Sequence, residues 1–457
     1  MKFYNREAEK KALEDAIKKS PALILIKGRR RVGKTALILN SIKENAIYFF
    51  IDNKKTEKNL LFEFEEILKK ELNLPNYIKI EKWEHFFQII FESKKTIILD
   101  EFQRILGISP SAINQLQKFW DLNPPKNALI LSGSNIGMIK KIFINEGSPL
   151  FKRATMDMTL KSLDFSVCKK ILKDLGIKDF ENQFKIYSII GGIPYYYSLL
   201  QNETIESWKD VVKIIFLNPF SPLKNEVNDT LIEGFGKEHL SYYAVLNAIA
   251  LGKTTKKEIS DFSGILPSSI SPYLYDLGNL LDIIEYEIPI TEKKPWKTKL
   301  GRFILKDNFF RFWFKFIFRH QSIYEKANYS YLFELIEKDF DSFSGFSFEN
   351  VAREFILKLN NKNNLPVKFD KIGRWWDRKG QEIDMVLISD RDDAIMLIEC
   401  KWKEDANPEM ILSSLMEKEK FLNHKKKNVF YGIIAKSFKN KTKNAIVFDI
   451  NDLEKNL

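Results

Sequence analysis

Residues 28–35 read Gly-Arg-Arg-Arg-Val-Gly-Lys-Thr, which is the spacing of a phosphate-binding loop. An apolar run at 22–27 precedes the loop, and a helix-like stretch at 36–44 follows it. Glycines allow backbone N–H groups to close around phosphate oxygens, and the following helix N-terminus adds partial positive charge. We expect Lys34 to reach the outer phosphates of ATP or ADP and the Thr35 hydroxyl to bind Mg²⁺. The residues expected to contact the nucleotide are Gly28, Arg29, Arg30, Arg31, Val32, Gly33, Lys34, Thr35 and Ala36.

Two adjacent acids follow the strand-like run Thr-Ile-Ile-Leu at 96–99. The run delivers Asp100 and Glu101 to the C-terminal end of a strand, beside the phosphate loop. Asp100 can hold Mg²⁺ through its water shell, and Glu101 can polarise the attacking water. Two acids at a strand end can also cap a turn, but the phosphate loop upstream favours the catalytic interpretation.

A second group of acids with a lysine lies near the C-terminus. Glu399 and Lys401 are two residues apart on an expected strand, so both point to one face. Asp384 on the neighbouring strand can join them, and Glu349 can add a fourth ligand from a helix. Carboxylates bind Mg²⁺ or Mn²⁺, while a nearby lysine orients or activates water for attack on a phosphodiester. The alternative is that each acid is a solvated strand residue or half of a surface ion pair.

Alternating strands and helices position the first two motifs. Strand-like runs lie at 47–51, 96–100, 127–132 and 155–160, with helix-like stretches at 57–72, 83–91 and 113–123. This alternation predicts an α/β fold with a parallel sheet covered by helices on both faces. One expected strand, 47–51, separates the two motifs. This resembles the additional-strand (ASCE) class of P-loop ATPases, which implies the sheet order 5-1-4-3-2.

The middle of the chain contains two helix-like stretches joined by a turn. The first is 242–251, and the second opens at Thr255, where Glu258 can close a capping box. A glycine turn at 264–267 then leads to a serine-rich helix. With 283–290 as a wing, this succession resembles a winged helix-turn-helix.

The expected wing is followed by a basic segment. From 291 to 320 there are nine Lys or Arg residues and two acids. A wing that faces duplex DNA needs this bias to neutralise phosphates. The serine-rich helix, however, offers Ser268, Ser269, Ser271 and Tyr273 but no Arg or Asn to read base edges. A lid or a protein-contact module is therefore the alternative.

The C-terminal acids lie within a succession of elements that reads αβββαβ. The expected helices are 344–359 and 408–422, and the expected strands are 372–376, 382–389, 394–401 and 428–435. This order resembles the restriction-endonuclease-like PD-(D/E)XK superfamily. The resemblance implies a metal-dependent nuclease, although such folds also serve as nucleic-acid-binding shells without activity.

Composition limits the classes of protein that fit. The net charge is +12, which favours anionic partners such as DNA. Two cysteines argue against a disulfide scaffold and fit a reducing interior, so we expect a cytoplasmic protein. No apolar run reaches the roughly 20 residues of a membrane span, and the polar start is not a signal peptide. The expected domains are 1–205, 206–320 and 325–457.

Several short motifs resemble one known family. They are Asn-Arg-Glu at 5–7, the loop at 28–35, Leu-Asp-Glu-Phe-Gln at 99–103, Leu-Ser-Gly-Ser at 131–134 and Gly-Gly-Ile-Pro-Tyr-Tyr at 191–196. Together they are similar to the archaeal P-loop ATPase family, which lies near AAA+ proteins and the signal-transducing ATPases with numerous domains. The resemblance implies an ATPase that uses ATP and Mg²⁺, and it covers most of the chain.

The resemblance also implies roles for single residues. In AAA+-like ATPases a polar residue after the fourth strand senses the γ-phosphate, and here this is Ser134 or Asn135. In related signalling ATPases a G-x-P turn packs on the adenine, and here Gly192 and Pro194 occupy that turn. A strand-end turn and a helix-breaking turn are the respective alternatives.

Arg153 is a further candidate catalytic residue. It can stabilise transition-state charge, either in cis or across the subunit interface of a homo-oligomer; a surface arginine is the alternative. The family's usual Ser-Pro-Leu-Tyr-Gly-Arg is Ser-Pro-Leu-Phe-Lys-Arg here. Lys152 in place of glycine changes the local backbone and so the direction of Arg153.

The expected function is ATP-dependent action on DNA with Mg²⁺-dependent cleavage. One rival is a nucleotide-controlled regulatory switch in which the C-terminal domain is an inactive scaffold. A second rival is a chaperone-like ATPase that acts on protein.

Overall fold

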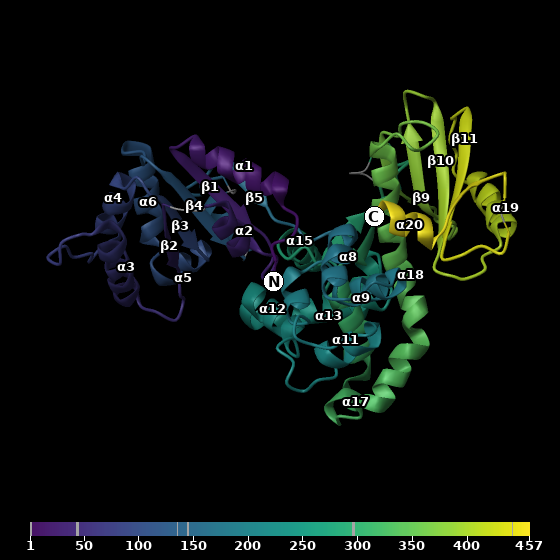
Figure 1. The fold of residues 1–457 in the computed structure, drawn as a ribbon, viewed down its shortest axis with the longest axis horizontal. Coiled ribbons are helices and arrows are strands. Elements are labelled where there is room, and N and C mark those ends of the chain that lie inside the picture. The colour runs from purple at the N-terminus through teal and green to yellow at the C-terminus, as the bar shows by residue number, and fades with distance from the viewer. Residues whose placement is uncertain (1, 43–44, 135, 144–145, 295–297, 441) are drawn as a thin grey trace.

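The computed structural model describes residues 2–42, 45–134, 136–143, 146–294, 298–440 and 442–457. Three regions follow one another across the molecule in Figure 1. An α/β unit of the N-terminal part lies at one end, a helical region lies in the centre, and a second α/β unit of the C-terminal part lies at the other end.

The N-terminal unit contains a five-stranded parallel sheet. Its strands are β1 (Ala22–Lys27), β2 (Ala46–Phe50), β3 (Thr96–Asp100), β4 (Ala128–Gly133) and β5 (Met156–Thr159). The order β2-β3-β4-β1-β5 confirms the predicted 5-1-4-3-2 arrangement. Strand β4 lies between β1 and β3, so the phosphate loop, the two acids and the polar turn after β4 meet at one edge.

Helices cover both faces of this sheet. They are α1 (Glu7–Lys18), α2 (Lys34–Ser41), α3 (Glu57–Leu72), α4 (Trp83–Glu92), α5 (Ile105–Ile108), α6 (Ser111–Leu122) and α7 (Ile136–Phe143), with a turn η1 (Phe102–Arg104). Successive residues of β1 enter different cores: Ile24 packs with α1 and α2, and Leu25 packs with α3, α4 and α6. This two-sided burial explains why β1 reads as an unbroken apolar run.

The central region is mainly helical. Its helices are α8 (Phe165–Asp174), α9 (Phe180–Ile190), α10 (Pro194–Ser198), α11 (Trp208–Ile215), α12 (Glu226–Phe235), α13 (His239–Ala250), α14 (Lys256–Ser263), α15 (Ile270–Asn279), α16 (Asn308–Phe312) and α17 (Gln321–Glu325), with turns η2 (Gly236–Glu238), η4 (Trp313–Ile317) and η5 (Phe318–His320). One hydrophobic core runs from α1 through these helices. The domain boundaries therefore stay predictions.

Helices α13, α14 and α15 are followed by an antiparallel pair, β6 (Ile284–Glu287) and β7 (Arg302–Leu305). Thr255 caps α14, and its capping box with Glu258 is present as predicted. Gly264 ends α14 in a left-handed conformation, with φ of +73°. The aromatic segment from Asn308 onward is a buried connector.

The C-terminal unit contains a five-stranded mixed sheet packed on a long helix. Its elements are α18 (Tyr329–Asn361), β8 (Lys371–Trp376), β9 (Glu382–Ser389), β10 (Ala394–Lys401), α19 (Pro408–Glu419), β11 (Asn428–Ala435), β12 (Ile446–Phe448) and α20 (Ile450–Asn456). The order is β12-β11-β10-β9-β8. Helix α18 begins well before the predicted 344, and β12 and α20 were not predicted.

Helix α18 connects the central region with the C-terminal sheet, as Figure 1 shows. Phe340 near its middle belongs to the central core, whereas Phe355 belongs to the C-terminal core. The sheet also contacts the N-terminal half of the chain directly. Trp402 packs on Phe184 of α9 with ring centroids 4.3 Å apart, and Glu354 of α18 accepts hydrogen bonds from the first backbone N–H groups of α8. Among the described residues, no helix is both long and apolar enough to cross a membrane.

Candidate functional site

The phosphate loop connects β1 to α2 in a conformation that needs its glycines. Gly28 has φ of +156°, and a Cβ there would lie 2.4 Å from the carbonyl oxygen of Leu160. Gly33 has φ of +98°. Lys34 is buried and its Nζ donates to the carbonyl oxygens of Gly28 at 2.9 Å and Arg29 at 3.1 Å. Burial lowers the pKa of Lys34. The loop thus holds the ammonium group of Lys34 next to its own backbone.

The Mg²⁺ side of the site is built around Asp100. Its carboxylate accepts hydrogen bonds from Thr35 Oγ1 at 2.8 Å, from Tyr48 OH at 2.7 Å and from Ser132. Hydroxyl and carboxylate oxygens are the ligands that Mg²⁺ prefers. The contact between Thr35 and Asp100 puts both predicted ligands in one place, and their binding of the ion stays a prediction. Tyr48, on β2, was not predicted.

We expect Tyr48→Phe to raise the Mg²⁺ concentration needed for half-maximal ATPase activity about fivefold, the effect of one hydrogen bond of about 1 kcal/mol. The physical reason is that the tyrosine hydroxyl orients Asp100. A Mg²⁺ titration of ATP hydrolysis measures the shift. Tyr77→Phe, at a side chain 79% exposed, is the matched control. An unchanged Mg²⁺ dependence would show that Tyr48 has no part in orienting Asp100.

Glu101 lies next to the turn after β4. Its Oε2 accepts from Gln103 Nε2 at 2.6 Å and from Ser134 Oγ at 2.8 Å. Glu101 itself adopts a left-handed backbone, with φ of +56°. Ser134, one of the two predicted γ-phosphate sensors, therefore contacts the acid predicted to activate water. The other, Asn135, lies outside the described residues.

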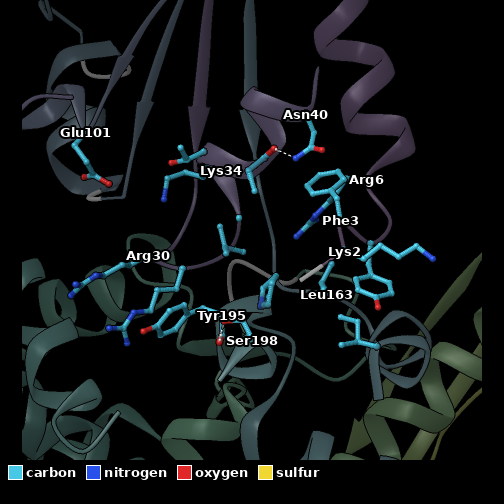
Figure 2. Close-up of a pocket in the computed structure, with 18 residues that line it drawn as sticks. Lys2, Phe3, Arg6, Arg30, Lys34, Asn40, Glu101, Leu163, Tyr195 and Ser198 are labelled. Carbon is cyan, nitrogen blue, oxygen red and sulfur yellow. Dashed lines mark hydrogen bonds between the residues drawn. The ribbon is translucent and has the colours of Figure 1, made fainter. Parts of the chain in front are cut away.

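A cavity of about 400 Å³ extends from these residues toward the N-terminus. In Figure 2, Lys34 and Glu101 lie on one side of it, and Phe3 and Asn40 lie on the other. Pro194 lines the cavity, and its contact with the adenine stays a prediction. The cavity thus has a phosphate end and an end with apolar walls and an amide, which suits a nucleotide.

Gly192 acts on this cavity through packing. A Cβ at Gly192 would lie 1.9 Å from the carbonyl oxygen of Leu163, which itself lines the cavity. The backbone of Leu163 therefore packs directly against Gly192, and this close approach determines the position of Leu163. Gly192 itself is not among the residues that line the cavity. Phe3, Asn40 and Leu163 were missed because no local pattern connects them with the loop.

The three arginines of the phosphate loop make ion pairs with a later part of the chain. Arg29 pairs with Asp307, Arg30 with Glu233 at 3.1 Å, and Arg31 with Glu226. Arg30 and Arg31 still line the cavity. Only the backbone of Arg29 remains for the nucleotide, because its guanidinium is buried beside Asp307. These three ion pairs connect the phosphate loop to the central helical region.

Arg153 does not line the nucleotide cavity. Its guanidinium makes a bidentate ion pair with Asp121 of α6, with both distances 2.7 Å. In this arrangement the charge of Arg153 is paired with Asp121 on another part of the domain, and a catalytic role in cis stays a prediction. A role across a subunit interface stays a prediction.

The structure brings Asp384, Glu399 and Lys401 together. The antiparallel register pairs Ile398 with Met385, which sets Glu399 beside Asp384 on adjacent strands. Lys401 Nζ donates to Glu399 Oε1 at 2.7 Å and lies 4.0 Å from Asp384 Oδ2. Both acids therefore face one side of the sheet. Burial, and then the charge of Glu399, raises the pKa of Asp384 to about 6.

Lys418 of α19 is a further member of this cluster. Its Nζ donates to both carboxylate oxygens of Glu399, at 2.9 and 3.0 Å. Lys418 could not be predicted from the sequence, because which side of α19 faces the sheet depends on tertiary packing.

Glu349 of α18 lies near enough to the cluster for the charges of Asp384 and Lys401 to act on it, and it is paired with an arginine. It accepts a hydrogen bond from Arg374 Nη2 at 2.6 Å, and Arg374 also contacts Glu287 of β6 at 3.2 Å. Burial raises the pKa of Glu349 to about 8. No group of three or more metal-binding side chains occurs among the described residues. The role of Glu349 as a fourth ligand stays a prediction, and in this arrangement Arg374 holds its carboxylate.

Three cations of the basic segment after β6 have partners within the chain. Arg302 pairs with Glu382, Lys306 pairs with Asp282, and Arg311 is hydrogen-bonded to Ser347. Lys293 and Lys294 are exposed. The residues 295–297 lie outside the described part of the chain. The cationic surface near the expected wing is therefore smaller than the residue count suggested.

Residues 3–200 match a family described as an ATPase domain predominantly from Archaea. Residues 313–429 match a family described as archaeal and bacterial proteins of unknown function. The uncharacterized protein MJECL04 of Methanocaldococcus jannaschii is 35% identical to this chain. The alignment covers 98% of this chain and 99% of the relative.

Solved structures show a likeness of fold. The Walker-type ATPase PABY2304 of Pyrococcus abyssi aligns with a TM-score of 0.52 and 18% identity, over 68% of this chain and 96% of that chain. The Aeropyrum pernix ORC1 protein, in complex with DNA, aligns with a TM-score of 0.38 and 14% identity, over 71% of this chain and 92% of that chain. The second score is too low to support a conclusion.

Proposed function

We propose, on the premise that this chain belongs to the same family as its Methanocaldococcus jannaschii relative and contains an archaeal ATPase domain, that it couples ATP hydrolysis to cleavage of DNA. The protein is a P-loop ATPase, with its nucleotide site at the carboxyl edge of the N-terminal sheet. In the proposal, α13–α15 with β6 and β7 act as a winged helix-turn-helix, and the C-terminal sheet acts as a nuclease-like domain.

The convergence of Asp384 and Glu399 on Lys401 carries the proposal. A Mg²⁺ or Mn²⁺ ion held by the two carboxylates would stabilise the charge that develops during phosphodiester hydrolysis. The lysine beside them is able to orient a water molecule. The net charge of +12 supports an anionic substrate.

The test is cleavage of single-stranded, duplex and branched DNA by the full-length protein, with Mg²⁺ or Mn²⁺ and with or without ATP. We expect wild type to cleave at least one substrate and Asp384→Ala/Glu399→Ala to cleave none above background. The matched control is Asp390→Ala/Asp393→Ala, which removes two acids at the far end of the same strand pair. Equal cleavage by the first double variant and wild type would assign the activity elsewhere.

A nucleotide-controlled regulatory switch is the second candidate function. The observation that favours it is the set of ion pairs from Arg29, Arg30 and Arg31 to the central helices, which tie the loop to another region. The pairing of Glu349 with Arg374 also suits an inactive scaffold. Tightly retained ADP after purification, with negligible turnover and no cleavage of any DNA, would favour the switch.

A further inference from the structure

Helix α12 presents two acids to the phosphate loop. Glu226 and Glu233 are seven residues apart, about two helical turns, so they lie on the same side of the helix. Glu226 is buried and accepts hydrogen bonds from Arg31 and from Tyr196 OH. Glu233 is exposed enough to meet solvent and pairs with Arg30 at 3.1 Å. The first acid anchors the helix, and the second approaches the nucleotide site.

Glu233 reaches the residues predicted to surround the γ-phosphate. Its Oε1 lies 3.3 Å from Ser134 Oγ, and that hydroxyl also contacts Glu101 at 2.8 Å. Arg104 Nη2 lies 4.0 Å from the same Oε1. The charge of Glu233 also acts on Lys34. A carboxylate from outside the parallel sheet therefore contacts the candidate sensor, and its charge acts on the phosphate-binding lysine.

We infer that Glu233 determines the nucleotide preference of this site by disfavouring a γ-phosphate while α12 stays in place. A terminal phosphate beside Lys34 and Ser134 would meet the negative charge of Glu233 at close range. Glu233 lies 3.3 Å from Ser134 Oγ, well inside the Debye length of about 8 Å at physiological salt, so salt screens this repulsion only in part. ADP ends before this position, so it is accommodated without the repulsion.

The same contacts connect the preference to the central helices. ATP can enter only when the Glu233 side chain leaves Ser134, which also changes its ion pair with Arg30. Helix α12 packs directly on α13, where Phe235 and Tyr242 stack with ring centroids 3.4 Å apart. A displacement of α12 therefore reaches the α13–α15 group. The inference rests on the nucleotide site and needs no activity on DNA.

The experiment compares the dissociation constants of ADP and a non-hydrolysable ATP analogue, AMPPNP, for the full-length protein with Mg²⁺. We expect wild type to prefer ADP by on the order of tenfold, a common size for coupling between sites. Glu233→Gln should bind AMPPNP about tenfold more tightly than wild type while its ADP affinity stays the same. Glu233→Lys should move the ratio further in the same direction.

Two controls separate charge from helix release. Asp229→Asn removes the same charge one turn earlier on α12, at an exposed residue, and should leave both affinities unchanged. Arg30→Gln breaks the ion pair and keeps the Glu233 carboxylate; because Arg30 lines the cavity, both affinities can fall, but their ratio should not shift toward AMPPNP. The inference is overturned if Glu233→Gln leaves the ratio unchanged, or if Arg30→Gln reproduces its effect. No DNA is present, so failure of the proposed DNA cleavage leaves this result unaffected.

Discussion

Lys34→Ala is expected to abolish measurable ATP binding, raising the dissociation constant roughly 100-fold or more. Lys34 is the buried cation of the phosphate loop. Its loss removes at least two charge-assisted hydrogen bonds to phosphate, each worth about 1.5–3 kcal/mol. Titration with a fluorescent ATP analogue measures the effect. Retained binding in Lys34→Ala would exclude the loop as the phosphate site.

Glu101→Gln completes this test because it separates binding from hydrolysis. The amide preserves the size of the side chain and leaves Thr35 and Asp100 intact. We expect nucleotide affinity to stay within about twofold while the hydrolysis rate falls about 10²–10⁴-fold, the usual contribution of a general base. Phosphate release under saturating ATP measures the rate. Full turnover in Glu101→Gln would remove this residue from the catalytic role.

The sheet order and the phosphate edge were predictable because their signals are local. The run before Gly28 is apolar at every position since both faces of β1 are covered. Two acids directly after β3 must then lie near the loop, because parallel strands end at the same edge. A short sequence pattern is enough to place reactive side chains when the strand repeat alone decides which way those side chains point.

The partners of the loop arginines were not predictable in the same way. Asp307 and Glu226 lie 278 and 195 residues beyond Arg29 and Arg31. Nothing in the local sequence distinguishes these acids from solvated ones. Their pairing depends on how the central helices pack under the sheet. The arginines therefore read as nucleotide ligands from the sequence, and as both loop and interface residues in the structure.

In the C-terminal cluster, too, some positions follow from the sequence and others depend on tertiary packing. Asp384 and Glu399 follow from strand alternation and adjacency, because a period of two residues fixes the face. Lys418 and Arg374 do not follow, because their positions depend on the packing of α19 and on the bulged pairing of β8 with β9. The start of α18 was missed since Ser344 and Gly345 are weak helix formers, and burial between two cores overrides that preference.

Asp307→Ala is expected to destabilise the protein by about 3–5 kcal/mol, the usual result of leaving a buried charge without its partner. Asp307 pairs with Arg29, whose side chain is only 7% exposed. Arg29 has a further contact with Tyr196 OH at 3.3 Å, which cannot replace a carboxylate. Asp307 also caps α16 by accepting from Phe310 N at 2.9 Å, so alanine removes two interactions at once.

Two further variants divide this effect into its parts. Asp307→Asn retains a capping oxygen and loses the charge, so it should be less damaging than alanine by about 1 kcal/mol. Asp390→Asn removes an acid from exposed pairs with Lys371 and Lys426, and should cost less than about 1 kcal/mol. Denaturant midpoints, read alongside nucleotide affinity, measure all three. If Asp307→Ala is no more destabilising than Asp390→Asn, the Arg29 pair does not hold the phosphate loop to the central helices. A large loss together with weakened nucleotide binding would mean that the loop keeps its shape through this contact.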